Sequence, residues 1–305
     1  MRVYVTGAIG FVGSWLQEEL GRHGHAVVPA PGPESLDITD RAGLVRWFRG
    51  GGTPEAVVHL AGMAFPQDAR TDPAEAFRVN VGGTTALFEA LRELEVRPPV
   101  LVVGSSEVYG SPAAKDLPLT ERSPVASLNP YALSKIGEEA VAVEASARHG
   151  FPVVVTRSFS HTGPRQRPVF VVPAIARRVI SVKRGQASCV YAGNVDVKRD
   201  LTDVRDVARA YRLLLEWLAG LPGPAAHVVN VASGTSVSIR SLIEQLCQMA
   251  GIEASIEVDE VLVRADDPAE IRGDATLLGQ LTGWRPEIPL RQTLADVLDE
   301  AATTR

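Results

Sequence analysis

The chain has few cysteines, and nothing in their spacing joins them. Of its 305 residues only Cys189 and Cys247 are cysteine, and they form neither a CxxC pair nor a metal-ligand spacing. This argues against a disulfide scaffold and favours two free thiols in a reducing cytoplasm. The six histidines do not cluster at ligand spacing either, so we predict no metal site.

Dense basic segments and long apolar runs are also missing. The formal net charge is −5, which argues against nucleic acid or an anionic membrane as the main partner. No apolar run approaches the ~20 residues that span a bilayer. The start, MRVYVTG, lacks the charged and apolar regions of a signal peptide, so we expect a cytoplasmic protein.

Short valine-rich runs recur through the first half of the chain. They do not alternate apolar and polar residues, which is typical of strands buried on both faces. Helical patterns separate them, and this succession predicts an α/β fold with a doubly wound parallel sheet of the Rossmann type. The runs occupy residues 2–7, 25–30, 56–62, 100–106 and 152–159.

The pattern becomes less regular after about residue 163, where Pro, Gly and Arg are frequent. We therefore expect a dinucleotide-binding domain over residues 1–163, rejoined by about 195–228. Residues 164–305 would form mainly a smaller, interleaved α/β substrate domain.

A glycine-rich turn follows the first predicted strand. In TGAIGFVG (6–13), Gly7, Gly10 and Gly13 have the spacing GxxGxxG and open a helix. Such glycines let a pyrophosphate approach the free N–H groups at the helix start. Glycines also make ordinary turns, but the position directly after strand one of a βαβ pattern favours dinucleotide binding.

The residues that would choose between NAD and NADP are not evident. A ribose-binding acid is expected about 20 residues after the glycines, yet the second predicted strand ends in PAPG (29–32), with Glu34 as the nearest acid. There is no arginine for a 2′-phosphate either, so the preference stays open. Asp37 either meets the adenine amino group or is simply an acid at a helix start.

A tyrosine and a lysine stand four residues apart in NPYALSK (129–135). Asn129 and Pro130 suit a helix cap and first turn, so Tyr131 and Lys135 share one helix face. A nearby ammonium favours the phenolate and would lower the tyrosine pKa, which suits carbonyl–alcohol interconversion. Such spacing is common on surface helices, and its weight here comes from Ser105, at the end of a predicted central strand.

Several segments together resemble an extended short-chain dehydrogenase/reductase, and the resemblance runs along nearly the whole chain. They are TGAIGFVG, HLAG, NVGGTT, GSSEVYG, PYALSK and RSFSHTGPRQ. Three later segments resemble the GDP-mannose branch, which includes 4,6-dehydratases and 6-deoxymannose reductases. These are GNVDVKRDLTDVRDVARAYRLLLE (193–216), VVNVASGTSVSIRSLI (228–243) and TGWRPEIPLRQTL (282–294).

The resemblance implies roles for residues across the chain. The catalytic group would be Ser105, Tyr131, Lys135 and Glu107. The cofactor-binding group would be Gly7, Gly10, Phe11, Val12, Gly13, Asp37, Ile38, Leu60, Ala61, Gly62, Tyr131, Lys135 and His161. The substrate-binding group would be Ser105, Ser106, Tyr131, Ser160, Val171, Arg177, Arg199, Arg264 and Asp267. Ser160 stands where the family usually has Asn, which predicts a weaker contact there.

Glu107 raises the main alternative. It occupies the position of the dehydratase glutamate that removes the C5 proton, but similar reductases often keep that acid. Its other interpretation is a residual acid that bonds a backbone N–H. The loop GFVG, where the dehydratases typically have GQDG, the shorter chain, and HTGPRQRPVFV favour a reductase.

The resemblance thus implies reduction of GDP-4-dehydro-6-deoxy-D-mannose to GDP-D-rhamnose with NADPH or NADH, by a homodimer. One alternative is GDP-mannose 4,6-dehydratase or another nucleotide-sugar epimerase or reductase. The other is a non-catalytic Rossmann protein that senses its cofactor.

Overall fold

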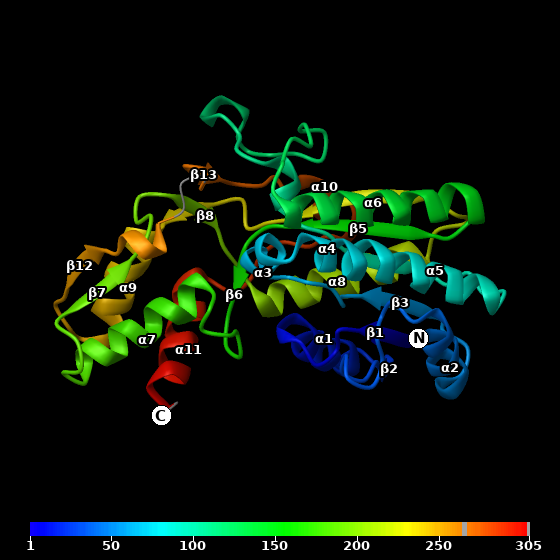
Figure 1. Cartoon of the computed structure of the whole chain (residues 1–305), viewed down its shortest axis with the longest axis horizontal. Coiled ribbons are helices and arrows are strands. Elements are labelled where there is room, and N and C mark those ends of the chain that lie inside the picture. The colour runs from blue at the N-terminus through cyan, green and yellow to red at the C-terminus, as the bar shows by residue number, and fades with distance from the viewer. Residues whose placement is uncertain (264–266, 304–305) are drawn as a thin grey trace.

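A six-stranded parallel sheet forms the centre of the protein (Figure 1). The computed structural model describes residues 1–263 and 267–303. The strands follow the order β10-β5-β4-β3-β1-β2, and every neighbouring pair is parallel. The predicted α/β class with a Rossmann sheet is confirmed. The strands are β1 (Arg2–Thr6), β2 (Ala26–Pro29), β3 (Ala56–His59), β4 (Val100–Val103), β5 (Val153–Ser158) and β10 (Ala226–Val231).

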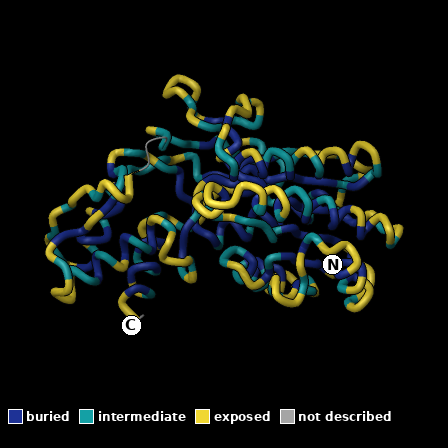
Figure 2. The backbone as a smooth tube through the Cα atoms, viewed as in Figure 1, coloured by how far each residue is buried: buried dark blue, intermediate teal, exposed yellow. Residues whose placement is uncertain are grey.

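Both faces of this sheet are buried, which explains the continuous apolar runs. Val3 and Val5 of β1 pack into the core on one face, while Tyr4 between them packs into the core on the other. Figure 2 shows the strands as buried backbone within a more exposed periphery. The first face is covered by α1 (Phe11–Arg22), α8 (Val204–Ala219) and α10 (Thr276–Thr282). The second is covered by α2 (Arg41–Gly51), α5 (Gly83–Glu93) and α6 (Pro130–His149).

The chain reverses its direction of winding beside β1. After β2 has paired on one side of β1, β3 pairs on the other side, and β4, β5 and β10 continue outward from there. In open α/β sheets, ligands bind in the crevice that this reversal creates beyond the carboxyl ends of the strands. The segments after β1, β3, β4 and β5 all start at this edge.

A second body packs beside the sheet around a core of its own, at the left in Figure 1. Its helices are α7 (Val171–Lys183), α9 (Ile239–Ala250) and α11 (Leu290–Thr303). Its strands are β7 (Cys189–Ala192), β8 (Lys198–Asp200), β11 (Ser236–Ser238), β12 (Ser255–Val258) and β13 (Glu270–Ile271). In sequence, α8 and β10 come between these elements, yet α8 packs on the large sheet and β10 is one of its strands. The two bodies are therefore interleaved. The exact domain limits stay a prediction.

Short elements complete the chain. Two small strands, β6 (His161–Thr162) and β9 (Thr202–Asp203), pair in parallel. Two short helices and a π-helical turn, α3 (Pro66–Thr71), α4 (Pro73–Phe77) and Arg78–Gly82, lead into α5. Single 3₁₀ turns lie at Ser106–Tyr109, Ala114–Asp116 and Glu260–Leu262. In the part of the chain that the structure describes, no helix has the length and apolar character needed to cross a bilayer.

Candidate active site

A cavity of about 1540 Å³ lies at the carboxyl edge of the sheet and extends to the second body. It brings together segments that follow five different strands, β1 to β5. From the predicted catalytic and cofactor groups its walls include Gly7, Gly10, Phe11, Val12, Gly13, Asp37, Ile38, Leu60, Ala61, Gly62, Ser105, Glu107, Tyr131, Lys135 and His161. From the predicted substrate group they include Ser106, Ser160, Val171, Arg199 and Asp267.

The glycine turn has the close geometry that a dinucleotide pyrophosphate needs. Gly7 has a φ of +67°, and a Cβ there would come within 2.7 Å of the backbone nitrogen of Ala61. A Cβ on Gly13 would come within 2.3 Å of the Gly7 carbonyl oxygen. Helix α1 starts at Phe11 with Gly10 as its cap, so no side chain occupies the helix N-terminus. The residues present therefore fit the phosphates of a dinucleotide.

A small polar cluster around Asp37 forms another part of the cavity wall. Asp37 accepts the backbone N–H of Thr39 at 2.9 Å, and its other oxygen pairs with Arg78 at 3.0 Å. The Thr39 N–H and the Arg78 charge lower the pKa of Asp37 although burial opposes them. Because α2 begins at Arg41 with Asp40 as its cap, Asp37 is not the capping acid of that helix. Arg78 also pairs with Glu75, so its charge is shared between two carboxylates.

Tyr131 and Lys135 lie in the first turns of α6, largely buried, and line the cavity floor. Asn129 caps the helix by accepting the Ala132 N–H at 2.8 Å. Lys135 Nζ donates to the Val103 carbonyl at 2.9 Å, which anchors the helix to the end of β4. The i, i+4 pair and its cap are thus arranged as the sequence predicts.

The predicted direction of the Tyr131 pKa shift is wrong. Burial raises the pKa of Tyr131, and this outweighs the lowering by the Lys135 charge and by the Ser105 hydroxyl. The phenol is fully buried, so the cost of desolvating a phenolate is larger than the attraction of one neighbouring ammonium. At neutral pH the tyrosine consequently keeps its proton, the form that can donate to a ketone oxygen.

Ser105 and Glu107 lie in the turn that follows strand β4. Strand β4 stops at Val103, and a 3₁₀ turn begins, in which Ser105 Oγ accepts the Glu107 N–H at 3.2 Å. The Glu107 side chain is exposed and accepts from Asn129 Nδ2 at 3.0 Å. The carboxylate thus bonds a side-chain amide at the start of the catalytic helix, whereas its alternative interpretation placed it on a backbone N–H.

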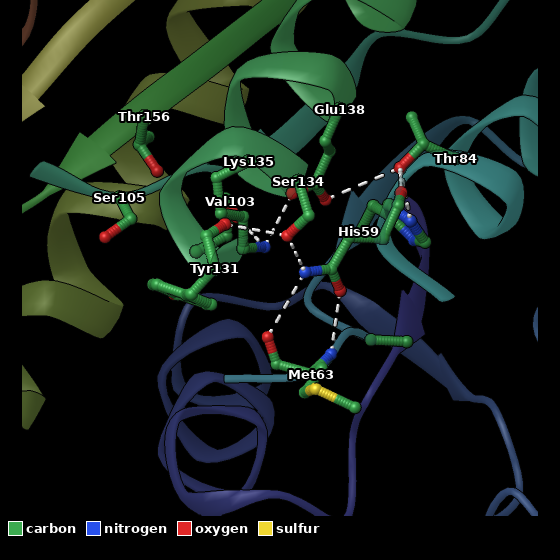
Figure 3. A network of polar contacts seen from close by, with 12 residues as sticks. His59, Met63, Thr84, Val103, Ser105, Tyr131, Ser134, Lys135, Glu138 and Thr156 are labelled. Carbon is green, nitrogen blue, oxygen red and sulfur yellow. Dashed lines mark hydrogen bonds and ion pairs between the residues drawn. The ribbon is translucent and has the colours of Figure 1, made fainter. Parts of the chain in front are cut away.

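A buried polar network around Lys135 was not predicted from the sequence (Figure 3). Glu138 Oε2 lies 2.6 Å from Lys135 Nζ, and its other oxygen is 3.4 Å from Thr84 Oγ1. His59 bridges Thr84 and Thr6 at 3.1 and 2.8 Å. Burial lowers the pKa of His59 to about 3, so its ring is neutral. The acid three residues after Lys135 was a visible signal; the partners from β1, β3 and α5 were not.

A second part of the network holds the loop after β3. Asn80 donates to Ser134 Oγ at 2.8 Å and to the Met63 carbonyl at 3.3 Å, and its oxygen accepts the Met63 N–H at 2.8 Å. Ser134 in turn donates to the Tyr131 carbonyl at 2.7 Å. Met63 directly follows Leu60, Ala61 and Gly62, which line the cavity, so Asn80 ties that segment to helix α6.

The side of the cavity nearest the second body carries an ion pair and two aromatic rings. Arg199 forms an ion pair with Asp267 and donates to the Pro268 carbonyl at 2.8 Å. The rings of Phe65 and Phe170 meet edge to face, 5.4 Å apart, where the sheet body and the second body face one another. The two phenylalanines line the cavity and had not been predicted, since they come from segments about a hundred residues apart.

Arg177 and Arg264 complete the predicted substrate group. Arg177 is exposed on α7 and does not line the cavity, although Val171 at the start of the same helix does. Six residues at ~100° each rotate a side chain by about 240°, so the two cannot share a face. Arg177 therefore lies outside the lining of this cavity, and its contact with guanine stays a prediction. Arg264 lies outside the described residues.

The fold and the site together define a dinucleotide-dependent oxidoreductase of the short-chain dehydrogenase/reductase class. A Rossmann sheet, a glycine turn and a Ser–Tyr–Lys group meet in one cavity. Residues 34–297 match the family described as GDP-mannose 4,6 dehydratase. The chain belongs to this family, and it is an enzyme that acts on nucleotide sugars.

Known relatives cover the chain almost completely. It is 36% identical to a GDP-6-deoxy-D-mannose reductase of Pseudomonas aeruginosa, over 98% of this chain and 96% of that protein. A GDP-mannose 4,6-dehydratase of Yersinia enterocolitica is 25% identical to it, over 86% of this chain and 76% of that protein.

Solved structures agree with these relationships. The structure of RMD from Pseudomonas aeruginosa complexed with NADPH superposes with a TM-score of 0.90 at 35% identity, covering 99% of both chains. A UDP-glucose 4-epimerase of Thermus thermophilus, in complex with NAD, reaches a TM-score of 0.84 at 26% identity over all of both chains.

Proposed function

We propose that the protein reduces the C4 ketone of GDP-4-dehydro-6-deoxy-D-mannose to GDP-D-rhamnose with NADPH or NADH. The observation that carries this proposal is the Ser105, Tyr131 and Lys135 group at the floor of the nucleotide cavity. It occurs in a chain 36% identical, along nearly its full length, to a protein of that activity. Among the reductase, dehydratase and epimerase activities of related proteins, this similarity favours the reductase.

The residues of this chain would divide the work as follows. When bound, NADPH or NADH supplies the hydride. Tyr131, which keeps its proton at neutral pH, gives that proton to the C4 oxygen. The Ser105 hydroxyl, which also contacts the Tyr131 phenol, holds the same oxygen. Lys135 binds the nicotinamide ribose and stabilises the phenolate left after proton transfer.

The cofactor would lie along the edge of the sheet. Gly7, Gly10 and Gly13 would admit its pyrophosphate, and Leu60, Ala61 and Gly62 would border its middle part. His161 stacks on Phe11 at 6.1 Å and would close the nicotinamide end. The tip of β2 offers the 2′ position neither an acid nor an arginine, which supports the use of both cofactors.

The GDP part would lie toward the second body. Arg199, whose guanidinium is already oriented by Asp267, supplies a planar cation for the diphosphate. Phe65 and Phe170 provide aromatic surface at the same side. Ser160 lines the cavity where a longer amide would reach further, so its contact with the sugar–phosphate would be weaker. Membership of the GDP-mannose family supports guanine as the base.

Substrate comparison tests this proposal. The purified protein is supplied with NADPH and, in separate reactions, GDP-4-dehydro-6-deoxy-D-mannose, GDP-mannose and UDP-glucose. Oxidation of NADPH should occur with the 4-keto sugar alone. Conversion of GDP-mannose to a 4-keto product would instead support the dehydratase, and interconversion of UDP-hexoses the epimerase.

The homodimer also belongs to the proposal. Light scattering coupled to size exclusion should give twice the mass of the 32.6 kDa chain. A mass equal to one chain at micromolar concentration would contradict it.

A further inference from the structure

A buried carboxylate lies behind the catalytic pair, and the reduction steps above do not use it. Glu138 stands one turn after Lys135 on α6, and only 1% of its side chain is exposed. Removing a carboxylate from water is costly unless a partner charge and hydrogen bonds compensate it. The partners of Glu138 therefore indicate what it does.

The strongest of these partners is the catalytic lysine. Glu138 Oε2 lies 2.6 Å from Lys135 Nζ, and Nζ also donates to the Val103 carbonyl at 2.9 Å. The ion pair with Glu138 and the hydrogen bond to Val103 hold the ammonium between a carboxylate and a carbonyl, at the edge of the cavity that Lys135 lines. In Figure 3, Glu138 approaches this lysine from one side, and Tyr131 and Ser105 lie toward the other.

The charges around the pair come from four elements. Glu138 lies on α6 itself, Glu107 follows β4, His59 ends β3, and Tyr211 belongs to α8. Burial lowers the pKa of His59 to about 3 and raises that of Tyr211 to about 12, so both are neutral at physiological pH. Glu107 is exposed to solvent, which screens its charge. Burial raises the pKa of Glu138, and the charge and contact of Lys135 oppose this rise. Glu138 is thus the buried carboxylate that faces the Lys135 ammonium.

We propose that Glu138 is a positioning residue for the reduction: its carboxylate orients the Lys135 ammonium and keeps the Tyr131–Lys135 pair fully protonated, ready to give a proton to a ketone. The inference deepens the proposed function and rests on it for the direction of proton transfer. The pairing itself rests on the buried geometry alone.

The sign of the effect does not depend on which member loses a proton first. Without the carboxylate, the ammonium would be a buried charge without a counterion, and a phenolate would lose a repelling neighbour. Both changes make the first proton easier to remove, and coupled groups titrate as a pair. In agreement, the charges of Glu138 and Tyr131 outweigh burial and raise the pKa of Lys135, while Glu138 adds to the burial that raises the pKa of Tyr131.

The test compares Glu138→Gln with a matched control at the next position. Glu139 pairs with Arg157 at 2.6 Å and faces β5 instead of the lysine, so Glu139→Gln removes an ion pair without touching the catalytic one. Carbon-13 NMR of the NADPH complex, labelled at tyrosine Cζ and lysine Cε, follows both groups. Substitution of Tyr131 by Phe assigns the tyrosine signal, and substitution of Lys135 by Met assigns the lysine signal.

In the wild type, neither carbon should titrate below the ordinary values of 10.0 for tyrosine and 10.5 for lysine. In Glu138→Gln, the first of them should titrate about 1–3 units lower than in the wild type, the effect of one close charge. The Glu139→Gln variant should keep the wild-type titration. An unchanged first titration in Glu138→Gln, or an equal shift in both variants, would overturn the proposal.

A second variant, Glu138→Asp, keeps the proposal testable if Glu138→Gln does not fold. Glu138→Asp keeps the charge but withdraws it by one methylene, so its first titration should fall by a smaller amount in the same direction. If Glu138→Gln does not fold, a wild-type titration in Glu138→Asp overturns the proposal. The alkaline limb of ketone reduction should move with the NMR values. Because the NMR readout needs no sugar substrate, absence of ketone reduction would reject the proposed function without deciding the role of Glu138.

Discussion

The Asn129 side chain joins Glu107 to the start of the catalytic helix. Its amide nitrogen donates to the Glu107 carboxylate at 3.0 Å, and its oxygen accepts the Ala132 N–H at 2.8 Å. One short side chain therefore connects the turn after β4 with the helix turn that carries Tyr131. The position typical of a dehydratase base is here occupied by an acid with a supporting contact of its own.

Glu107→Gln should keep most of the ketone-reducing activity. The amide oxygen can still accept from Asn129, and a reductase needs no base at C5. Steady-state rates with the 4-keto sugar measure this. Incubation of the wild type with GDP-mannose is the accompanying control, and efficient formation of a 4-keto product that the variant loses would make Glu107 the base of a dehydratase.

Tyr131→Phe should lower turnover by roughly 10²–10⁴-fold, the usual contribution of a positioned general acid. NADPH affinity should stay near the wild-type value, because the phenyl ring fills the same buried space. Fluorescence titration of NADPH and initial-rate kinetics separate the two. Turnover within a few-fold of wild type would remove Tyr131 from the mechanism.

Both cofactors should support reduction, with kcat/KM values within about one to two orders of magnitude. Strand β2 ends in Pro29, and the PAPG segment that follows it into the loop has no side chain to repel or attract a 2′-phosphate. Parallel kinetics with NADH and NADPH test this. Strict dependence on one of them would show that another residue reads the 2′ position; Arg78, held by two carboxylates, would then be the first to substitute.

His59 should make the fold sensitive to acid. Its pKa is 6.5 when unfolded and about 3 when buried, so the unfolded chain binds more protons between these values. Stability therefore falls as pH drops below 6.5, by about 2 kcal/mol at pH 5 from this group alone. Urea unfolding at pH 5 and 7.5 should show a smaller loss for His59→Gln than for the wild type. An equal loss in both would exclude His59 as the cause.

Arg199→Met should raise KM for the GDP sugar while leaving the affinity for NADPH unchanged. The guanidinium lines the substrate side of the cavity, and its removal takes away a fork that matches phosphate oxygens. Asp267 would then lie without its partner in a site meant for an anion. A lowered affinity for NADPH together with an unchanged KM for the GDP sugar would show that Arg199 binds the cofactor and not the substrate.

The parts of the structure that depend on local sequence could be predicted. The valine runs indicate strands buried on both faces, and the turn from Gly7 to Gly13 and the Tyr131–Lys135 spacing are properties of neighbouring residues. The parts that depend on packing could not. The contacts of Glu138 form only because α6 packs against α5. The Phe65–Phe170 contact forms only where the two bodies meet.

Two differences between the sequence-based expectation and the structure have physical causes of the same kind. The Tyr131 pKa was predicted from one neighbouring charge, whereas the depth of burial decides its direction. Arg177 was placed by resemblance of sequence, whereas the rotation of α7 turns it toward solvent.

Transfer of deuterium from labelled NADPH tests the central claim most directly. The protein is incubated with GDP-4-dehydro-6-deoxy-D-mannose and NADPH carrying deuterium at nicotinamide C4 in each configuration, and the product is analysed by NMR and mass spectrometry. The account predicts GDP-D-rhamnose with one deuterium at sugar C4 from one of the two labelled cofactors. A product that lacks deuterium at C4 with both labelled cofactors, or an unchanged ketone together with intact NADPH, would contradict it.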